Sequence, residues 1–190
     1  MLIISQNLSN YNIPIPDDAV FRINLAWVNS TNELEILLKK HAKHDIFLDL
    51  PINRTKPPGN NYSLSDIIPI INNHGNVKFF AISNVESADD VMKYKESLDS
   101  RVNIIPKIES PKGVENIQQI CEILNLDKKI IMLDHDDLYS ALRSQNIPKE
   151  QFTEYIDRLT KFCKENDVIL LRTIGVIFSD SEKRISQYVG

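Results

Sequence analysis

The sequence predicts an α/β fold made of repeated strand–helix units, and three observations carry this prediction. Short apolar, β-branched runs recur along the 190 residues. Each run is almost continuously apolar, which is typical of parallel strands covered on both faces. Amphipathic helical patterns with recognisable start signals lie between most of the runs. This alternation predicts right-handed βαβ units, arranged either as a (β/α)8-type barrel or as an open doubly wound sheet.

Seven predicted strands follow one another along the chain. They are Leu2–Ser5, Val20–Leu25, Ile46–Leu50, Val77–Ile82, Val102–Ile108, Ile130–Leu133 and Val168–Leu171. The segment between the first two leaves no room for a helix. Seven strands in series favour a barrel, although the periodicity is the same in an open sheet.

The predicted helices begin at small polar residues that can cap a first turn. Ser30 with Glu33 and Ser87 with Asp90 have the spacing of a capping box, and Ser110 is followed by a proline at the first helical position. The helical patterns are Leu34–Leu38, Ile67–Asn72 after Ser65-Asp66, Val91–Leu98, Val114–Leu124 and a longer one that starts at Pro148.

Composition restricts the class of protein. A formal net charge of −4 with 42% hydrophobic and 25% charged residues indicates a globular chain with a real core and argues against a nucleic-acid partner. There is no glycine-rich nucleotide motif, no signal peptide and no stretch of 18 apolar residues. Cys121 and Cys163 are expected to be buried thiols. We therefore expect one cytoplasmic domain, residues 1–190, without a membrane partner.

Polar residues gather where the predicted strands end. They are Arg22 and Asn24, Asp49 with Arg54 soon after, Ser83-Asn84, Lys107 and Glu109, Asp134-His135-Asp136-Asp137, and Arg172-Thr173. In a barrel all these ends meet on one face, where active sites are built. Buried strands need few such groups for stability, so the pattern predicts an active site.

The residue types at these ends indicate metal-assisted chemistry. Glu109 and one of the strand-six aspartates can supply carboxylate oxygens to Mg²⁺ or Mn²⁺, which would polarise a carbonyl and stabilise a developing enolate. Arg22 can bind an anionic substrate or neutralise the enolate oxygen. Lys107 points to the same side of its strand as Glu109, and a metal beside it would lower its pKa.

Several of these segments resemble, in the same order, the catalytic barrel of pyruvate kinase. The strongest match is Lys107–Asn116, K-I-E-S-P-K-G-V-E-N, which is similar to the family's K-I-E-N-x-E-G-V-x-N. Arg22–Asn24 resembles its R-x-N, and Asp49 with Arg54-Thr55 resembles its third-strand segment. Weaker matches are Ala81–Val91, Ile131–Leu138 and Val168–Thr173. The series also resembles the aldolases related to citrate lyase β-subunit and to hydroxy-oxo-acid aldolases, which have no lysine at position 107.

The resemblance implies a TIM-barrel-like fold and a role for each matching position. Lys107 would be the active-site lysine, Glu109 and Asp137 the metal ligands, and Thr173 a catalytic threonine near the reacting carbon. Arg22 would contact the substrate and the enolate. The other substrate-binding positions would be Asn24, Asp49, Arg54 and Ser83, of which Asn24 and Asp49 match monovalent-cation ligands.

The departures from the family point away from kinase chemistry. Only Pro51–Tyr62 separates the third strand from the next helix, so the lid domain on which ADP binding depends has no counterpart. The C-terminal domain has none either. Ala26 and Trp27 replace the Ser-His that follows R-x-N, which weakens a potassium site. Asp136 and Tyr139 replace the two glycines of the family's G-D-L-G.

Three functions follow as hypotheses. The first is a Mg²⁺-dependent enzyme that acts on pyruvate, another 2-oxo acid or phosphoenolpyruvate through a metal-stabilised enolate, with lyase or aldolase chemistry. The second is phosphoryl transfer with phosphoenolpyruvate, which Lys107 favours. The third is an inactive barrel that serves as a binding or regulatory subunit, which the lost glycines favour.

Each singled-out residue also has a structural alternative. Glu109 and Asp137 can be helix caps, Lys107 can form an internal ion pair with either of them, and Arg22 can pair with Asp49. His135 is an acid/base candidate at a position that the family fills with arginine.

The length predicts a trimmed barrel. A complete (β/α)8 barrel takes about 250 residues, and no eighth strand is evident unless Ile174–Phe178 extends the sheet. An exposed seam would need covering, which predicts a homo-oligomer.

Overall fold

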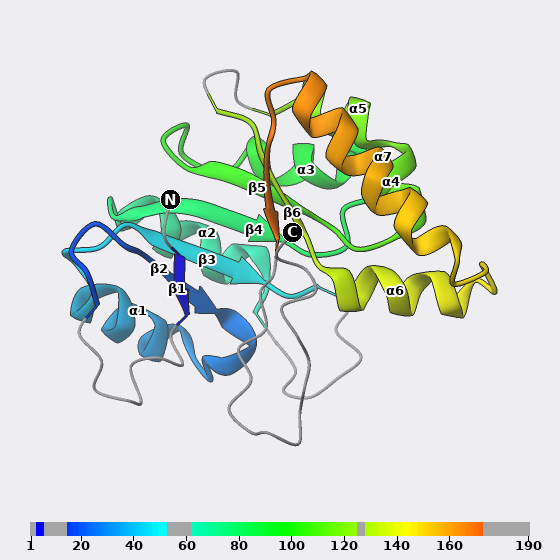
Figure 1. The fold of residues 1–190 in the computed structure, drawn as a ribbon. Coiled ribbons are helices and arrows are strands. Elements are labelled where there is room, and N and C mark those ends of the chain that lie inside the picture. The colour runs from blue at the N-terminus through cyan, green and yellow to red at the C-terminus, as the bar shows by residue number, and fades with distance from the viewer. Residues whose placement is uncertain (1–2, 6–14, 53–61, 125–127, 173–190) are drawn as a thin grey trace.

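Seven parallel strands form one curled sheet in the computed structural model, which describes residues 3–5, 15–52, 62–124 and 128–172 (Figure 1). The strands follow one another across the sheet in the order in which they occur along the chain. A doubly wound sheet reverses its strand order at a switch point, and the described strands show no reversal. The sheet is therefore a curled half-barrel, and the doubly wound alternative is wrong.

The strand bounds agree with the apolar runs to within a residue or two. They are β1 Ile3–Ser5, β2 Val20–Asn24, β3 Ile46–Leu50, β4 Val77–Ile82, β5 Asn103–Ile108, β6 Ile130–Leu133 and β7 Ile169–Arg172. Every neighbouring pair is parallel. No ladder joins β7 to β1 within the described part of the chain, and the suggested extension at Ile174–Phe178 lies outside it.

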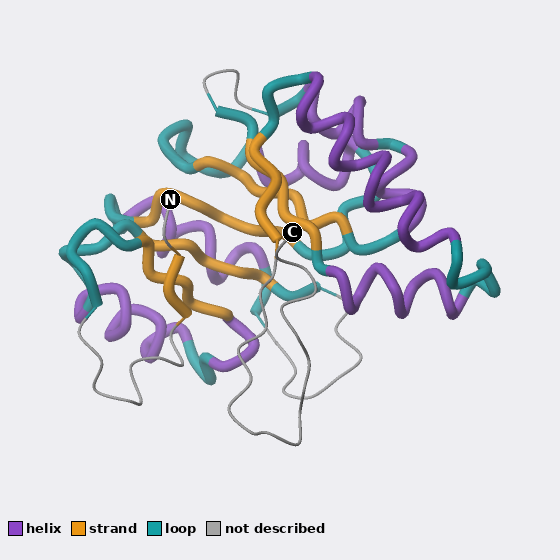
Figure 2. The backbone as a smooth tube through the Cα atoms, viewed as in Figure 1, coloured by secondary structure: helices purple, strands orange, loops and turns teal. Residues whose placement is uncertain are grey.

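The helices flank the outer side of this sheet (Figures 1 and 2). They are α1 Thr31–Lys40, α2 Leu64–Asn73, α3 Ala88–Lys95, α4 Pro111–Glu115, α5 Ile117–Glu122, α6 His135–Ser144 and α7 Gln151–Glu165, with a 3-10 turn, η2, at Leu25–Trp27. No helix among the described residues is long and apolar enough to cross a membrane.

Most helices begin where their capping residues predict. Ser87 and Asp90 form the expected capping box on α3, and Ser110 caps α4 ahead of Pro111. The box on α2 uses Ser63 with Asp66 rather than Ser65. On α1, Ser30 accepts from the Glu33 backbone, but the Glu33 carboxylate accepts from Asn29.

Three features differ from the sequence expectations. The helix after Ser110 is divided at Asn116 into α4 and α5, and α7 begins at Gln151 rather than at Pro148. Helix α6 is not among the predicted helices, although Asp137 is a helix-cap candidate in the sequence; the capping residue is Asp134 instead. Asp134 caps this helix by accepting from the Asp137 backbone.

The two faces of the sheet bury different side chains. Outward-facing strand residues such as Phe21, Leu48 and Phe80 belong to a large core shared with the helices. A separate cluster consists of strand residues alone: Val20, Phe47, Ala81, Ile105, Ile130 and Met132, with Ile3, Phe79 and Leu171 packed against it. Because side chains alternate along a strand, the residues two positions further on share this inner face.

A close contact locks the β4–α3 loop to the start of α4. A Cβ built at Gly113 would lie 2.6 Å from the Val85 carbonyl oxygen. The Asn116 side-chain amide donates to the Glu86 backbone carbonyl at 2.8 Å, and the Ser110 hydroxyl donates to the Glu86 carboxylate at 2.7 Å. This junction fixes the position of residue 109, which lies between β5 and α4.

We expect Gly113→Ala to lower the free energy of unfolding by about 1 to 3 kcal/mol, because the added methyl must displace backbone. Gly75→Ala is the matched control, since a Cβ there has nothing within 4 Å. Chemical denaturation of both variants checks this. Equal stability of the two variants would contradict the close contact.

Candidate active site

The inner face of the sheet changes from apolar to polar toward the carboxyl ends of the strands. Phe47 is followed by Asp49, Ala81 by Ser83, and Ile105 by Lys107 and then Glu109, all on the same face. Strands β2 and β6 repeat the pattern, from Val20 to Arg22 and Asn24, and from Met132 to Asp134. Side chains from five neighbouring strands therefore form a polar layer above an apolar one.

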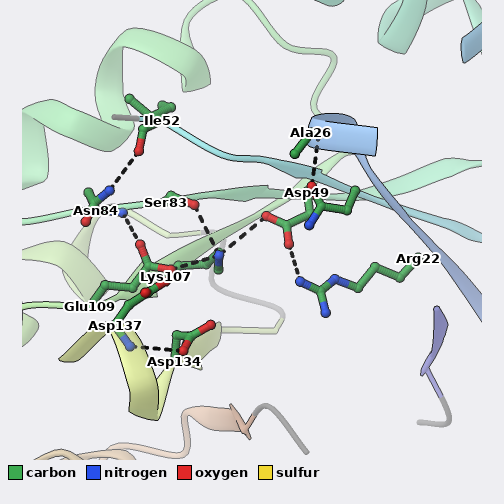
Figure 3. Close-up of polar contacts among 11 residues, drawn as sticks. Arg22, Ala26, Asp49, Ile52, Ser83, Asn84, Lys107, Glu109, Asp134 and Asp137 are labelled. Atoms are coloured by element: carbon green, nitrogen blue, oxygen red, sulfur yellow. Dashed lines mark hydrogen bonds and ion pairs between the residues drawn. The ribbon is translucent and has the colours of Figure 1, made fainter. Parts of the chain in front are cut away.

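Lys107 lies at the centre of this polar layer (Figure 3). Its ammonium is 2.8 Å from Glu109 Oε1 and 3.6 Å from Asp49 Oδ1, and it donates to Ser83 Oγ at 3.1 Å. All four residues are buried. The lysine therefore joins β3, β4 and β5 through charge-assisted contacts away from bulk water.

Asp49 connects Lys107 to Arg22. One Arg22 amino group donates to Asp49 Oδ2, so this carboxylate faces a cation on each side. The Arg22 side chain stays 23% exposed, whereas that of Asp49 is 1% exposed. The guanidinium can therefore still meet a ligand from solvent. Asn24 is used differently, since its side-chain oxygen accepts from the Ala26 backbone and caps η2.

Glu109 is held by a backbone donor as well as by Lys107. The Asn84 N–H donates to Glu109 Oε2 at 2.7 Å, and the Asn84 side-chain amide donates to the Ile52 carbonyl at 2.8 Å (Figure 3). Asn84 adopts a left-handed conformation, with φ of 54°. Sequence reasoning missed this contact, because a backbone donor leaves no mark on residue type.

Three carboxylates converge beside Lys107. Glu109, Asp134 and Asp137 each place one oxygen within 4.8 Å of the others, with Glu109 buried, Asp134 half-buried and Asp137 exposed. All-oxygen ligands of this kind fit a hard divalent cation such as Mg²⁺. Counted with Asp49, Arg22 and Lys107, these side chains carry four negative and two positive formal charges, a net of −2 that one divalent cation would balance.

Burial and neighbouring charges shift the ionisation of this cluster. Burial lowers the pKa of Lys107, but the charges of Asp49 and Glu109 outweigh that effect and raise it overall. Burial also raises the pKa of Glu109, and the opposing effect of Lys107 only partly offsets this. Lys107 is therefore a firmly protonated cation here, and a proton can compete with a metal at Glu109.

The structure gathers most of the predicted site residues. Arg22, Asp49, Ser83, Lys107 and Glu109 form one network, with Asp137 at its edge. The Arg22–Asp49 and Lys107–Glu109 pairs named as structural alternatives are both present. Arg54 and Thr173 lie outside the described residues.

The structure shows which of the polar residues predicted near α6 belong to the site. Asp134 joins Glu109 and Asp137 in the carboxylate cluster, whereas Asp136 does not. His135 is buried, and both its burial and the charge of Arg172 lower its pKa. Arg172 donates to Thr160 on α7 rather than entering the polar network.

Comparisons with known proteins bear on the fold alone. No protein-family model matches the sequence, and no curated protein matches it either. Among solved structures, the crystal structure of RipC from Yersinia pestis aligns with a TM-score of 0.59 and 16% identity, over 85% of this chain and 72% of that chain. At this identity the likeness supports the barrel-like α/β architecture and says nothing of activity.

We expect Asp49→Asn to lower the free energy of unfolding by about 3 kcal/mol, because Arg22 and Lys107 both lose the buried carboxylate that joins them. Asp45→Asn is the matched control, as Asp45 is an exposed acid next to the same strand. Denaturant titrations at low salt measure both. A loss of stability no greater than that of the control would show that Asp49 does not hold the network.

Proposed function

We propose that this protein is a Mg²⁺- or Mn²⁺-dependent enzyme that acts on pyruvate, another 2-oxo acid or phosphoenolpyruvate through an enolate, with C–C lyase or aldolase chemistry. One observation carries the proposal: a carboxylate triad, a buried lysine and a partly exposed arginine meet at the carboxyl ends of parallel strands. That end of a barrel-like sheet is where such folds build their active sites.

Glu109, Asp134 and Asp137 are the residues that would hold the cation. When bound, Mg²⁺ would supply Lewis-acid polarisation of a substrate carbonyl. The formal net charge of −2 supports this assignment, because the negative charge attracts a divalent cation, which would balance it. Asp49 and Asn24 give no comparable support to a monovalent-cation site, since Asp49 already pairs with Lys107 and Arg22 and the Asn24 oxygen caps η2.

The cationic side chains would act on the substrate. Arg22 presents a partly exposed guanidinium whose position Asp49 fixes, which suits it to a carboxylate or an enolate oxygen. Lys107, as a protonated ammonium, would stabilise negative charge that develops beside it. Ser83, which accepts from Lys107, would hold that ammonium in place.

Lyase or aldolase chemistry is favoured over phosphoryl transfer by the short connection after β3. Phosphoryl transfer with phosphoenolpyruvate remains the second candidate because Lys107 lies in the network. A test for phosphoryl transfer from phosphoenolpyruvate to ADP, measured as the formation of ATP and pyruvate, separates the two, since positive transfer would contradict the lyase assignment.

For the whole chain we propose a trimmed (β/α)8 barrel, which the unbroken sequential strand order supports. The open seam between β1 and β7 in the described residues supports a homo-oligomer. Two buried free thiols, Cys121 and Cys163, support a cytoplasmic setting.

Enolate formation predicts proton exchange. With Mg²⁺ and pyruvate in D₂O, we expect the pyruvate methyl protons to exchange in the presence of the protein, as followed by NMR. Glu109→Gln removes the buried carboxylate of the triad and should abolish both exchange and Mg²⁺ binding. Glu96→Gln, an exposed glutamate at the end of α3, should change neither.

Acidification should weaken Mg²⁺ binding of the unaltered protein, because protons compete for Glu109, whose pKa lies above its ordinary value. The affinity is therefore retained above that pKa and lost as the pH falls through it. Absence of exchange with every divalent cation, together with absence of pyruvate binding, would overturn the proposed function.

Lys107→Met should have opposite effects on Mg²⁺ binding and on the proton exchange of pyruvate. Its ammonium lies 2.8 Å from Glu109 Oε1, so removing it should tighten Mg²⁺ binding by about tenfold or more, equal to about 1.4 kcal/mol. Proton exchange should be lost in the same variant. Isothermal titration calorimetry and the NMR assay measure the two effects, and weaker Mg²⁺ binding would show that Lys107 does not oppose the cation.

A further inference from the structure

Asn84 donates to one of the two carboxylate oxygens of Glu109. Its N–H donates to Glu109 Oε2 at 2.7 Å, while its side chain is tied to the Ile52 carbonyl. The next residue, Val85, donates its N–H to the Lys107 carbonyl at 3.2 Å, which holds this loop against β5. The Asn84 amide is thus a fixed donor, aimed at one of the two carboxylate oxygens.

Asp134 is restricted in the same way. Its Oδ1 accepts from the Asp137 N–H at 3.3 Å as the cap of α6. Two of the three clustered carboxylates therefore have one oxygen engaged by backbone. Each keeps one oxygen that these backbone donors do not engage; at Glu109 this is Oε1, which lies 2.8 Å from the Lys107 ammonium, so a cation would compete with Lys107 for it.

Single-oxygen carboxylates discriminate between divalent cations. Mg²⁺ takes six ligands in a tight octahedron, and each carboxylate commonly gives it one oxygen. Ca²⁺ takes six to eight oxygens and is well served by carboxylates that bind through both. A site whose glutamate cannot bind through both oxygens therefore favours the smaller ion.

We propose that Asn84 is a selectivity-determining residue, whose backbone N–H confines Glu109 to one oxygen and so makes the site prefer Mg²⁺ or Mn²⁺ over Ca²⁺. This inference rests on the proposed metal site and adds the group that selects the metal. Asn84 acts through Glu109 and is a positioning residue, not a ligand.

The left-handed backbone of Asn84 gives the proposal a selective test. Asparagine and glycine adopt this conformation readily, whereas a β-branched residue opposes it. Asn84→Gly keeps the conformation and the N–H. Asn84→Val turns the peptide away and loses the donor. Asp167→Val is the matched control, because Asp167 also has a left-handed backbone, with φ of 53°, just before β7.

The experiment measures the affinities of the full chain for Mg²⁺ and for Ca²⁺ by isothermal titration calorimetry. We expect the unaltered protein and Asn84→Gly to prefer Mg²⁺ to a similar degree. Asn84→Val should bind Mg²⁺ about 10- to 100-fold more weakly, the usual effect of losing a group that orients a metal ligand, with a smaller change for Ca²⁺. Asp167→Val should lose stability while keeping the Mg²⁺-to-Ca²⁺ affinity ratio.

Every outcome either supports or overturns the proposed role of Asn84. An unchanged affinity ratio in Asn84→Val, or a loss in Asn84→Gly as large as in Asn84→Val, would overturn the role of Asn84 while leaving the metal site intact. No divalent binding by the unaltered protein would overturn the metal site and this inference together. If Asn84→Val does not fold, a crystal structure of the Mn²⁺-loaded protein answers the question. Glu109 bound through one oxygen would support the proposal, and Glu109 bound through both would contradict it.

Discussion

The buried ion pair between Lys107 and Glu109 is the contact on which the candidate site depends. Two carboxylates, Asp49 and Glu109, cannot remain ionised away from water without a cation between them. Lys107 supplies that cation from the same strand as Glu109, and Asp49 extends the network to Arg22 on β2. The network therefore fixes three strand ends relative to one another. It also places a positive charge beside Glu109, which would repel an incoming metal cation.

The alternation of side chains along each strand makes the polar network possible. Side chains alternate along each strand, so the outward set builds the core with the helices while the inward set divides into an apolar and a polar layer. The turns above the polar layer are fixed by close contacts, such as Gly113 against the Val85 carbonyl, and by backbone donors such as Asn84. Backbone groups thus orient the carboxylates, and cationic side chains balance their charge.

Much of the architecture and part of the site could be predicted from the sequence. The predictions failed where one residue pattern fits two different structures. Apolar runs located all seven strands, and capping residues located most helices, because both are local properties of the chain. Helix α6 is not predicted, although Asp137 is a helix-cap candidate, because acids at a strand end fit a metal site as well as a helix cap. Asp134 also proved to belong with the carboxylate cluster, which spacing alone could not distinguish from Asp136.

The sequence by itself determined the parallel α/β character, the strand positions and the identity of the charged groups at the strand ends. Only the tertiary structure decided between a doubly wound and a sequential sheet, because strand order is set by non-local pairing that periodicity does not record. It likewise decided that Arg22 pairs with Asp49, that Lys107 is shared between two carboxylates, and that Asn84 donates to Glu109. The Arg22–Asp49 and Lys107–Glu109 pairs were alternatives that residue type and spacing already offered. The Lys107–Asp49 contact joins segments far apart in the sequence, and the Asn84 contact uses a backbone donor, so neither could be predicted from the sequence.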